Sequence, residues 1–132
     1  MFGGGLRPYT LAPINRGCVN KITLLTQKPG DNWIDKTSKK LYFTAKTEPW
    51  DTDADDSDAI FKVEGTIPNP TKEPGRVVFT LTEEDTYIDP DKLYFFDIVQ
   101  TNSDGTNAER LMIGNFNVIP GPNNAQAGGE TE

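Results

Sequence analysis

Short stretches in which apolar and polar residues alternate run through most of this chain, separated by turns rich in proline and glycine. In the stretch KKLYFTAKT, Leu41, Phe43 and Ala45 fall on one side and the residues between them on the other. A period of two belongs to a β-strand with one buried face. Ten prolines and twelve glycines in 132 residues leave little room for long helices. The sequence therefore predicts an all-β domain.

Further segments carry the same pattern, and their spacing is typical of a β-sandwich. Residues 89–101 are apolar on both faces over several positions, as in a central strand. Residues 81–88 predict one short helical turn. The remaining strand candidates are residues 19–26, 59–67, 76–82 and 109–120. We expect an antiparallel β-sandwich of about seven strands.

The last strand candidate contains a change of phase. Leu111 and Ile113 keep one alternation, and Phe116 and Val118 resume it one position later. Gly114 lies between the two pairs, and a phase change at a glycine is typical of a β-bulge. A bulge is therefore expected at Gly114.

Tyr94 indicates which kind of sandwich this is. It follows a loop and stands two residues before Phe96, which the alternation points inward. A tyrosine in this place forms the tyrosine corner of immunoglobulin domains, with Phe96 standing in for their cysteine. The sequence thus predicts an immunoglobulin-like sandwich.

The two ends of the chain differ from its middle. Residues 1–18 combine three consecutive glycines with scattered apolar side chains and predict an extended N-terminal arm, whose deletion should leave the sandwich folded. Residues 19–120 form the predicted sandwich, and residues 121–132 are polar and glycine-rich, which predicts a flexible tail. The apolar residues of the arm that we expect to bind a partner are Phe2, Leu6, Tyr9 and Leu11.

Composition argues against several classes of function. A formal net charge of −7 disfavours nucleic acid and anionic membranes as partners. The chain has no histidine, so the commonest general base and transition-metal ligand is missing, and we expect no enzyme activity. The single cysteine, Cys18, is expected to be a small apolar residue at the start of a strand. Residues 1–17 lack the features of a signal peptide.

The stretch WDTDADDSDAI raises the question of a calcium site. An EF-hand loop that begins at Asp51 would need glycine at its sixth position and glutamate at its twelfth, where this chain has Asp56 and Lys62. The motif fails at both places, so a solvated acidic loop is favoured and no metal or other cofactor is predicted. A looser calcium site stays open. Its candidate ligands are Asp51, Asp53, Asp55 and Asp58.

Other polar and aromatic residues invite a functional interpretation. Glu83, Glu84 and Asp85 supply carboxylates, but hydrolysis needs two that converge on a cleft, and a polar turn is the simpler interpretation. Trp33 and Trp50 lie near loop ends and could stack on a sugar, although such tryptophans more often close the end of a sandwich.

The sequence resembles the immunoglobulin-like domains of tailed-bacteriophage structural proteins, in particular the N-terminal domain of the baseplate upper protein type. The resemblance covers residues 19–119. Its most distinctive part is a strand with Y-x-x-D-I, an Asp-Gly hairpin and a closing strand that ends G-x-F-x-V. The stretches that carry it are GDNW, KLYFTAK, DADDSDAIFK, GRVVFTLTEEDT and LYFFDIVQTNSDGTNAERLMIGNFNV.

The resemblance implies a virion building block without enzymatic activity, made in the host cytoplasm. Its expected partners are other virion structural proteins and further copies of the same chain. The sequence departs from the baseplate pattern, because we expect no long helix or receptor-binding module after residue 119. A place in the tail, the baseplate, a fibre attachment or the capsid surface therefore stays open. The competing hypothesis is a carbohydrate- or calcium-dependent binding module.

Overall fold

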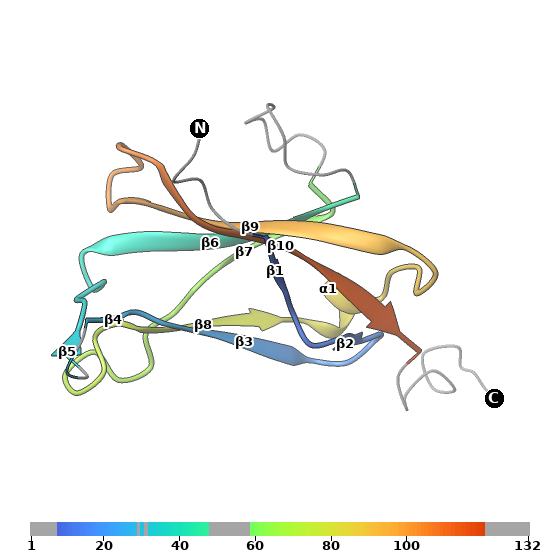
Figure 1. Cartoon of the computed structure of the whole chain (residues 1–132), viewed down its shortest axis with the longest axis horizontal. Helices are drawn as coiled ribbons and strands as arrows, with labels where there is room; N and C mark the ends of the chain where they lie inside the picture. The colour runs from blue at the N-terminus through green and yellow to red at the C-terminus, as the bar shows by residue number, and fades with distance from the viewer. Residues whose placement is uncertain (1–7, 29, 31, 48–58, 121–132) are drawn as a thin grey trace.

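The chain folds into two layers of β-strands that face each other (Figure 1). The structure is a computed structural model that describes residues 8–28, 30, 32–47 and 59–120. The larger sheet has the strand order β1-β10-β9-β6-β7, and β2 also pairs with β10. Its strands are β1 (Pro8–Thr10), β2 (Ile14–Asn15), β6 (Lys39–Lys46), β7 (Phe61–Glu64), β9 (Leu93–Asn102) and β10 (Glu109–Ile119).

The smaller layer consists of β3 (Asn20–Leu25) paired with β8 (Arg76–Leu81). A short hairpin of β4 (Gln27–Lys28) and β5 (Asn32–Trp33) leads from β3 back to the larger sheet. After β7 the chain crosses from the larger sheet to the smaller layer, where Thr66 forms a bridge to Val78 of β8. A short helical turn, α1 (Glu83–Thr86), follows β8 and confirms the turn predicted for residues 81–88.

The fold is an immunoglobulin-like β-sandwich, as the sequence predicts. Strands β6, β9 and β10 form the antiparallel centre of one layer, and β3 and β8 form the other. One detail differs from the prediction of a purely antiparallel sandwich. Strands β1 and β2 both run parallel to β10, so the larger sheet is mixed.

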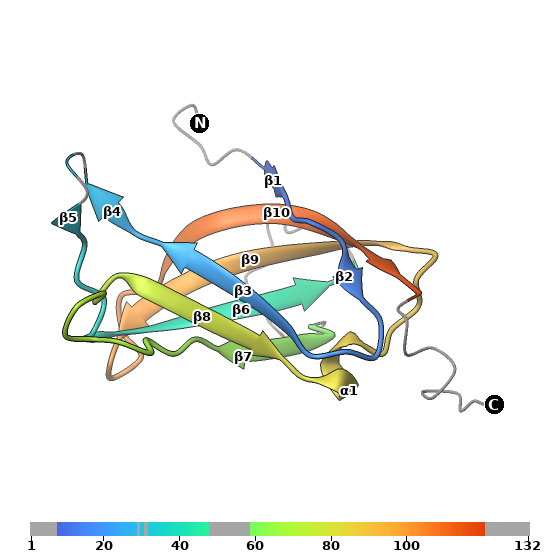
Figure 2. The ribbon, with the colours of Figure 1, turned by 90° about the horizontal axis from the view of Figure 1, so that it is seen from below.

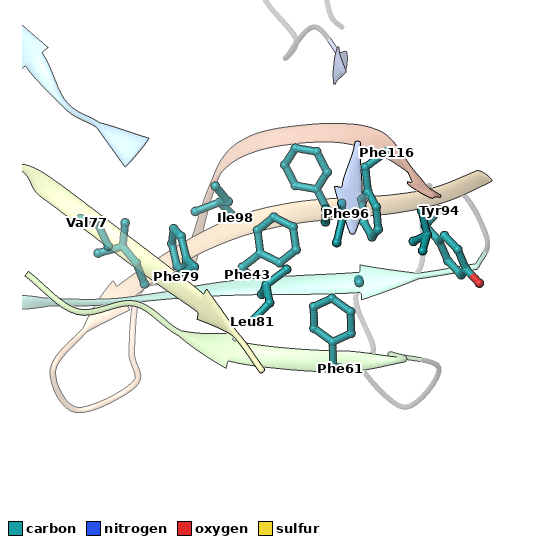
Figure 3. Close-up of a cluster of buried hydrophobic side chains, with 13 residues drawn as sticks. Phe43, Phe61, Val77, Phe79, Leu81, Tyr94, Phe96, Ile98 and Phe116 are labelled. Atoms are coloured by element: carbon teal, nitrogen blue, oxygen red, sulfur yellow. The ribbon is translucent and has the colours of Figure 1, made fainter. Parts of the chain in front are cut away.

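Aromatic rings from both layers fill the space between the sheets (Figure 3). Phe43 of β6 is fully buried and lies at the centre of this cluster. Its ring centroid is 4.9 Å from that of Phe96 in the same sheet and 5.9 Å from that of Phe79 in the other. Burial of such side chains is the main favourable term in folding, and Phe43 couples the two layers directly.

The tyrosine corner is present. The buried Tyr94 donates its hydroxyl to the backbone carbonyl of Asp89 at 2.7 Å, across the loop that enters β9. Its ring stacks on Phe116 of the neighbouring strand, with centroids 5.5 Å apart. The hydrogen bond fixes the loop to the strand, and the ring anchors both to the core, so the prediction for this residue is confirmed.

The predicted bulge at Gly114 is wrong, because the register of β10 against β9 shifts between Arg110 and Met112 instead. Gly114 itself pairs regularly with Phe96. A Cβ at this position would overlap the carbonyl oxygen of Tyr9 and lie 2.6 Å from the Phe96 ring. The glycine therefore allows close packing rather than a change of register.

The boundary predicted for the N-terminal arm also needs correction. Residues 8–15 belong to the sandwich, since β1 and β2 pair with β10. Ile14 is buried with an exposed fraction of 3%, and Leu11 is half buried against the same core. Strands this short are too brief to show an alternation in the sequence. Residues 1–7 and 121–132 lie outside the described part of the chain, so the rest of the arm and the tail stay predictions.

Replacing Tyr94 by phenylalanine should lower the free energy of unfolding by about 1–2 kcal/mol, because the corner hydrogen bond is lost while the ring is kept. Burial raises the pKa of Tyr94 above its ordinary value of 10.0. The folded state thus favours the neutral hydroxyl, and its contribution should be complete below pH 10 and disappear at more alkaline pH. Urea titrations at neutral and alkaline pH measure both effects.

The control for this substitution is Tyr87→Phe, since Tyr87 is exposed. It should leave stability nearly unchanged at neutral pH. Equal losses in the two variants would contradict a structural role for the corner.

A chain that begins at residue 19 should be markedly less stable than the full chain. This deletion removes Ile14 and Leu11 from the core and strips β1 and β2 from the edge of β10. Loss of one large buried aliphatic side chain alone typically costs about 2–5 kcal/mol. A chain that lacks only residues 2–7 keeps every described strand and should unfold near the melting temperature of the full chain at low protein concentration. Equal stability of both truncated chains would show that residues 8–15 add nothing to the fold.

Candidate functional site

Many of the residues predicted to carry function fall outside the part of the chain that the structure describes. This holds for the four candidate calcium ligands, for Trp50 and for Phe2 and Leu6 of the arm. Trp33 is half buried in β5, the second strand of the short hairpin. Among the described residues, no group of three or more histidine, cysteine or acidic side chains is placed to hold a metal ion.

The acidic residues after β8 have a structural role. The hydroxyl of Thr82 accepts a hydrogen bond from the backbone of Asp85, and the Asp85 carboxylate accepts one from the backbone of Thr82. This is a capping box, which satisfies backbone donors at the start of a helix. Glu83 and Glu84 are exposed and lie in the first turn of α1, where their negative charges interact favourably with the helix dipole. The polar-turn interpretation accounts for these residues.

Cys18 is half buried in the connection between β2 and β3. Its backbone amide donates to the hydroxyl of Thr86 at 3.1 Å, and its carbonyl accepts from the same hydroxyl at 2.7 Å. Thr86 is fully buried, so these two hydrogen bonds between the end of α1 and the Cys18 backbone lie inside the fold. The position of Cys18 is thus set by its backbone, two residues before β3 begins.

The outer face of the larger sheet carries a pocket of about 330 Å³. Arg110 donates from Nε to the Asp97 carboxylate at 3.1 Å, and Asp97 is buried. The ammonium of Lys62 lies 4.7 Å from the centre of the Tyr42 ring, which is a cation–π contact. The residues that line the pocket are Tyr42, Thr44, Lys46, Lys62, Asp97, Val99, Thr101, Ala108, Glu109 and Arg110.

This outer-face pocket brings three cationic side chains close to Asp97 and Glu109. Asp97 is paired with Arg110, Lys62 contacts the Tyr42 ring, and the Glu109 carboxylate accepts a hydrogen bond from Gln100. This pocket is not among the features predicted from the sequence. A carboxylate within an apolar strand, as Asp97 stands within YFFDIV, was the available signal for it.

The described surface also exposes large apolar side chains. Leu25, at the end of β3, has an exposed fraction of 56%, and Val19, just before that strand, has 55%. Tyr9, which the sequence analysis named as a partner-binding residue, is exposed on β1, whereas Leu11 is half buried in its own sandwich. Partner binding by either residue stays a prediction. The other exposed large apolar residues are Tyr87, Leu93 and Ile119.

No family model matches the chain, and no curated protein matches it at a significant level. Within the described ranges, no helix is long and apolar enough to cross a membrane.

Replacing Asp85 by alanine should lower stability by about 1 kcal/mol, the usual cost of losing part of a helix cap. Glu84→Ala removes a neighbouring carboxylate that makes no cap bond and should change stability much less. Thermal unfolding of the two variants measures the difference. A loss from Glu84→Ala as large as that from Asp85→Ala would contradict the capping role.

Proposed function

We propose that this chain is a structural protein of a tailed-bacteriophage particle and that it acts through protein–protein contacts. The observation that carries the proposal is the unpaired edge of β3. Among the described strands only β8 pairs with β3, and the exposed Val19 and Leu25 lie at the two ends of β3. An open strand edge beside exposed apolar side chains is a natural place for another chain to bind.

Three other polar features of the described part support the same proposal because they serve the fold. The carboxylate of Asp85 caps a helix, Tyr94 holds the tyrosine corner, and Thr86 fixes the Cys18 backbone. An enzyme would place such groups where a substrate reaches them. In this sandwich they stabilise loops and strand ends.

The resemblance of residues 19–119 to baseplate domains supports assignment to a virion. An acidic surface, with a net charge of −7, keeps single copies soluble before assembly and suits a neighbour with a basic face. The partners in this proposal are other virion structural proteins and further copies of the chain. The role is a building block of the tail, the baseplate, a fibre attachment or the capsid surface.

The test is to look for the protein in phage particles. Particles from the source culture are purified on a density gradient, and each fraction is analysed by mass spectrometry. We expect the protein to peak with the major capsid and tail proteins at a constant ratio. The control is a particle-free lysate to which purified protein has been added, where it should stay at the top of the gradient. Absence of the protein from the particle fractions would contradict the proposal.

A further inference from the structure

The backbone of β3 directs half of its hydrogen-bonding groups away from the sandwich. Val78 of β8 uses its N–H and its C=O for bonds to Thr66, at 2.7 and 2.8 Å. Val78 is the register partner of Thr23, so these two residues form no backbone bonds with each other. The N–H and C=O of Thr23 therefore point to the open side. Because backbone groups alternate in direction along a strand, the N–H and C=O of Lys21 and Leu25 also point to the open side.

The two outer strands of the larger sheet, β7 and β1, are better protected. Strand β7 carries the exposed charged residues Lys62 and Glu64, and β1 has only three residues and begins with Pro8. Charges, proline and short length are the usual means by which proteins block pairing at an edge. Strand β3 has six residues, no proline and a single charged residue, Lys21, near its start.

The core is also incompletely covered along β3. Ile22 and Leu24 point inward but are only half buried, whereas their register partners on β8, Phe79 and Val77, are buried almost completely. Leu111 and Met112 of β10 are likewise only partly buried against the core. A strand placed beside β3 would remove this apolar surface from water and pair the free backbone groups of β3.

The geometry of the two layers favours a single extended segment as the occupant. The larger sheet continues past β3, because β10 and β1 lie beyond it on the side away from β8 (Figure 2). A second sandwich that approached edge to edge would bring its own larger sheet against β10. A single added strand needs only the space beside β3, where the larger sheet extends past the smaller layer.

The sequence of residues 1–7, MFGGGLR, fits that space. At a strand period of two, Phe2 and Leu6 fall on one face, with Gly4 between them. Seven extended residues span about 23 Å, close to the length of β3 at about 3.3 Å per residue. The segment carries Arg7 and no acidic residue, which suits an acidic protein.

The same chain cannot bring the backbone of Leu6 alongside its own β3 as part of an added strand. Pro8 pairs with Ile113 in the larger sheet, and Leu6 is only two residues away. Two residues reach about 7 Å, whereas packed sheets lie about 10 Å apart. Strand pairing of the whole segment with β3, Leu6 included, therefore requires a second copy of the chain.

We propose that residues 1–7 of one copy add a third strand to the smaller sheet of a neighbouring copy, along the open edge of β3. Phe2 and Leu6 would lie against Ile22 and Leu24 of that neighbour. This inference rests on the proposed function and names the contact through which copies of the chain assemble. A head-to-tail exchange of this kind builds rings or filaments, according to the rotation between copies.

The experiment is the solution mass of the full chain by light scattering, compared with three kinds of variant. The full chain should form a multimer. Deletion of residues 2–7 should reduce the mass to that of a single chain. Thr23→Pro should do the same, because it removes the outward N–H without breaking a bond to β8. Its matched control, Thr23→Ala, keeps the N–H and should stay multimeric.

A charge test avoids any change to the sandwich itself. The double variant Phe2→Asp with Leu6→Asp should raise the concentration needed for assembly at least tenfold, which corresponds to about 1.4 kcal/mol. The control is Gly3→Asp with Gly5→Asp, which adds the same charge on the opposite face of the segment and should have a much smaller effect. Circular dichroism and melting curves confirm that each variant is folded.

A multimer that survives both the deletion and Thr23→Pro would overturn this inference and leave the proposed function standing. A full chain with the mass of a single copy at all concentrations would also overturn it. The search for the protein in purified particles is independent of both results and decides the proposed function separately.

Discussion

The contact of Phe43 with rings from both layers is the interaction on which the rest of the structure depends. Its neighbours Phe96 and Phe79 belong to opposite sheets, so the cluster sets how the sheets face each other. The larger sheet then positions β10, and β10 in turn holds β1 and β2 along its edge. Among the described residues the smaller layer has two strands, and this leaves β3 with an open side. The proposed assembly contact follows from this difference in the number of strands between the two layers.

Much of this fold could be predicted from alternation alone. The alternation around Phe43 identifies a strand with one buried face, and the apolar run in residues 89–101 identifies a central strand. The spacing of Tyr94 from Phe96 identifies the tyrosine corner. All three depend on residues close in sequence. The bulge was misplaced because the phase of apolar residues in β10 does not reveal which face they occupy. Ile113 pairs with Asp97 and lies on the opposite face from Phe116, yet it is buried as well. Burial on both faces removes the signal that alternation relies on.

The candidate surfaces were harder to predict than the fold. The capping role of Asp85 can be read from Thr82 three residues earlier, as a local motif. The pairing of β1 and β2 with β10 joins residues about a hundred positions apart, such as Thr10 and Asn115, and no local pattern encodes it. The open edge of β3 is likewise a property of sheet order. Alternation indicates that residues 19–26 form a strand, but not how many neighbours that strand has.

Amide hydrogen exchange in β3, followed residue by residue by NMR at several protein concentrations, tests the central claim most directly. The N–H groups of Ile22 and Leu24 face β8 and should be protected at every concentration. Those of Thr23 and Leu25 face the open edge and should become protected only as concentration rises, and never in a chain that lacks residues 2–7. Fast exchange of Thr23 and Leu25 at all concentrations would show that no second copy pairs with β3 and would contradict the account.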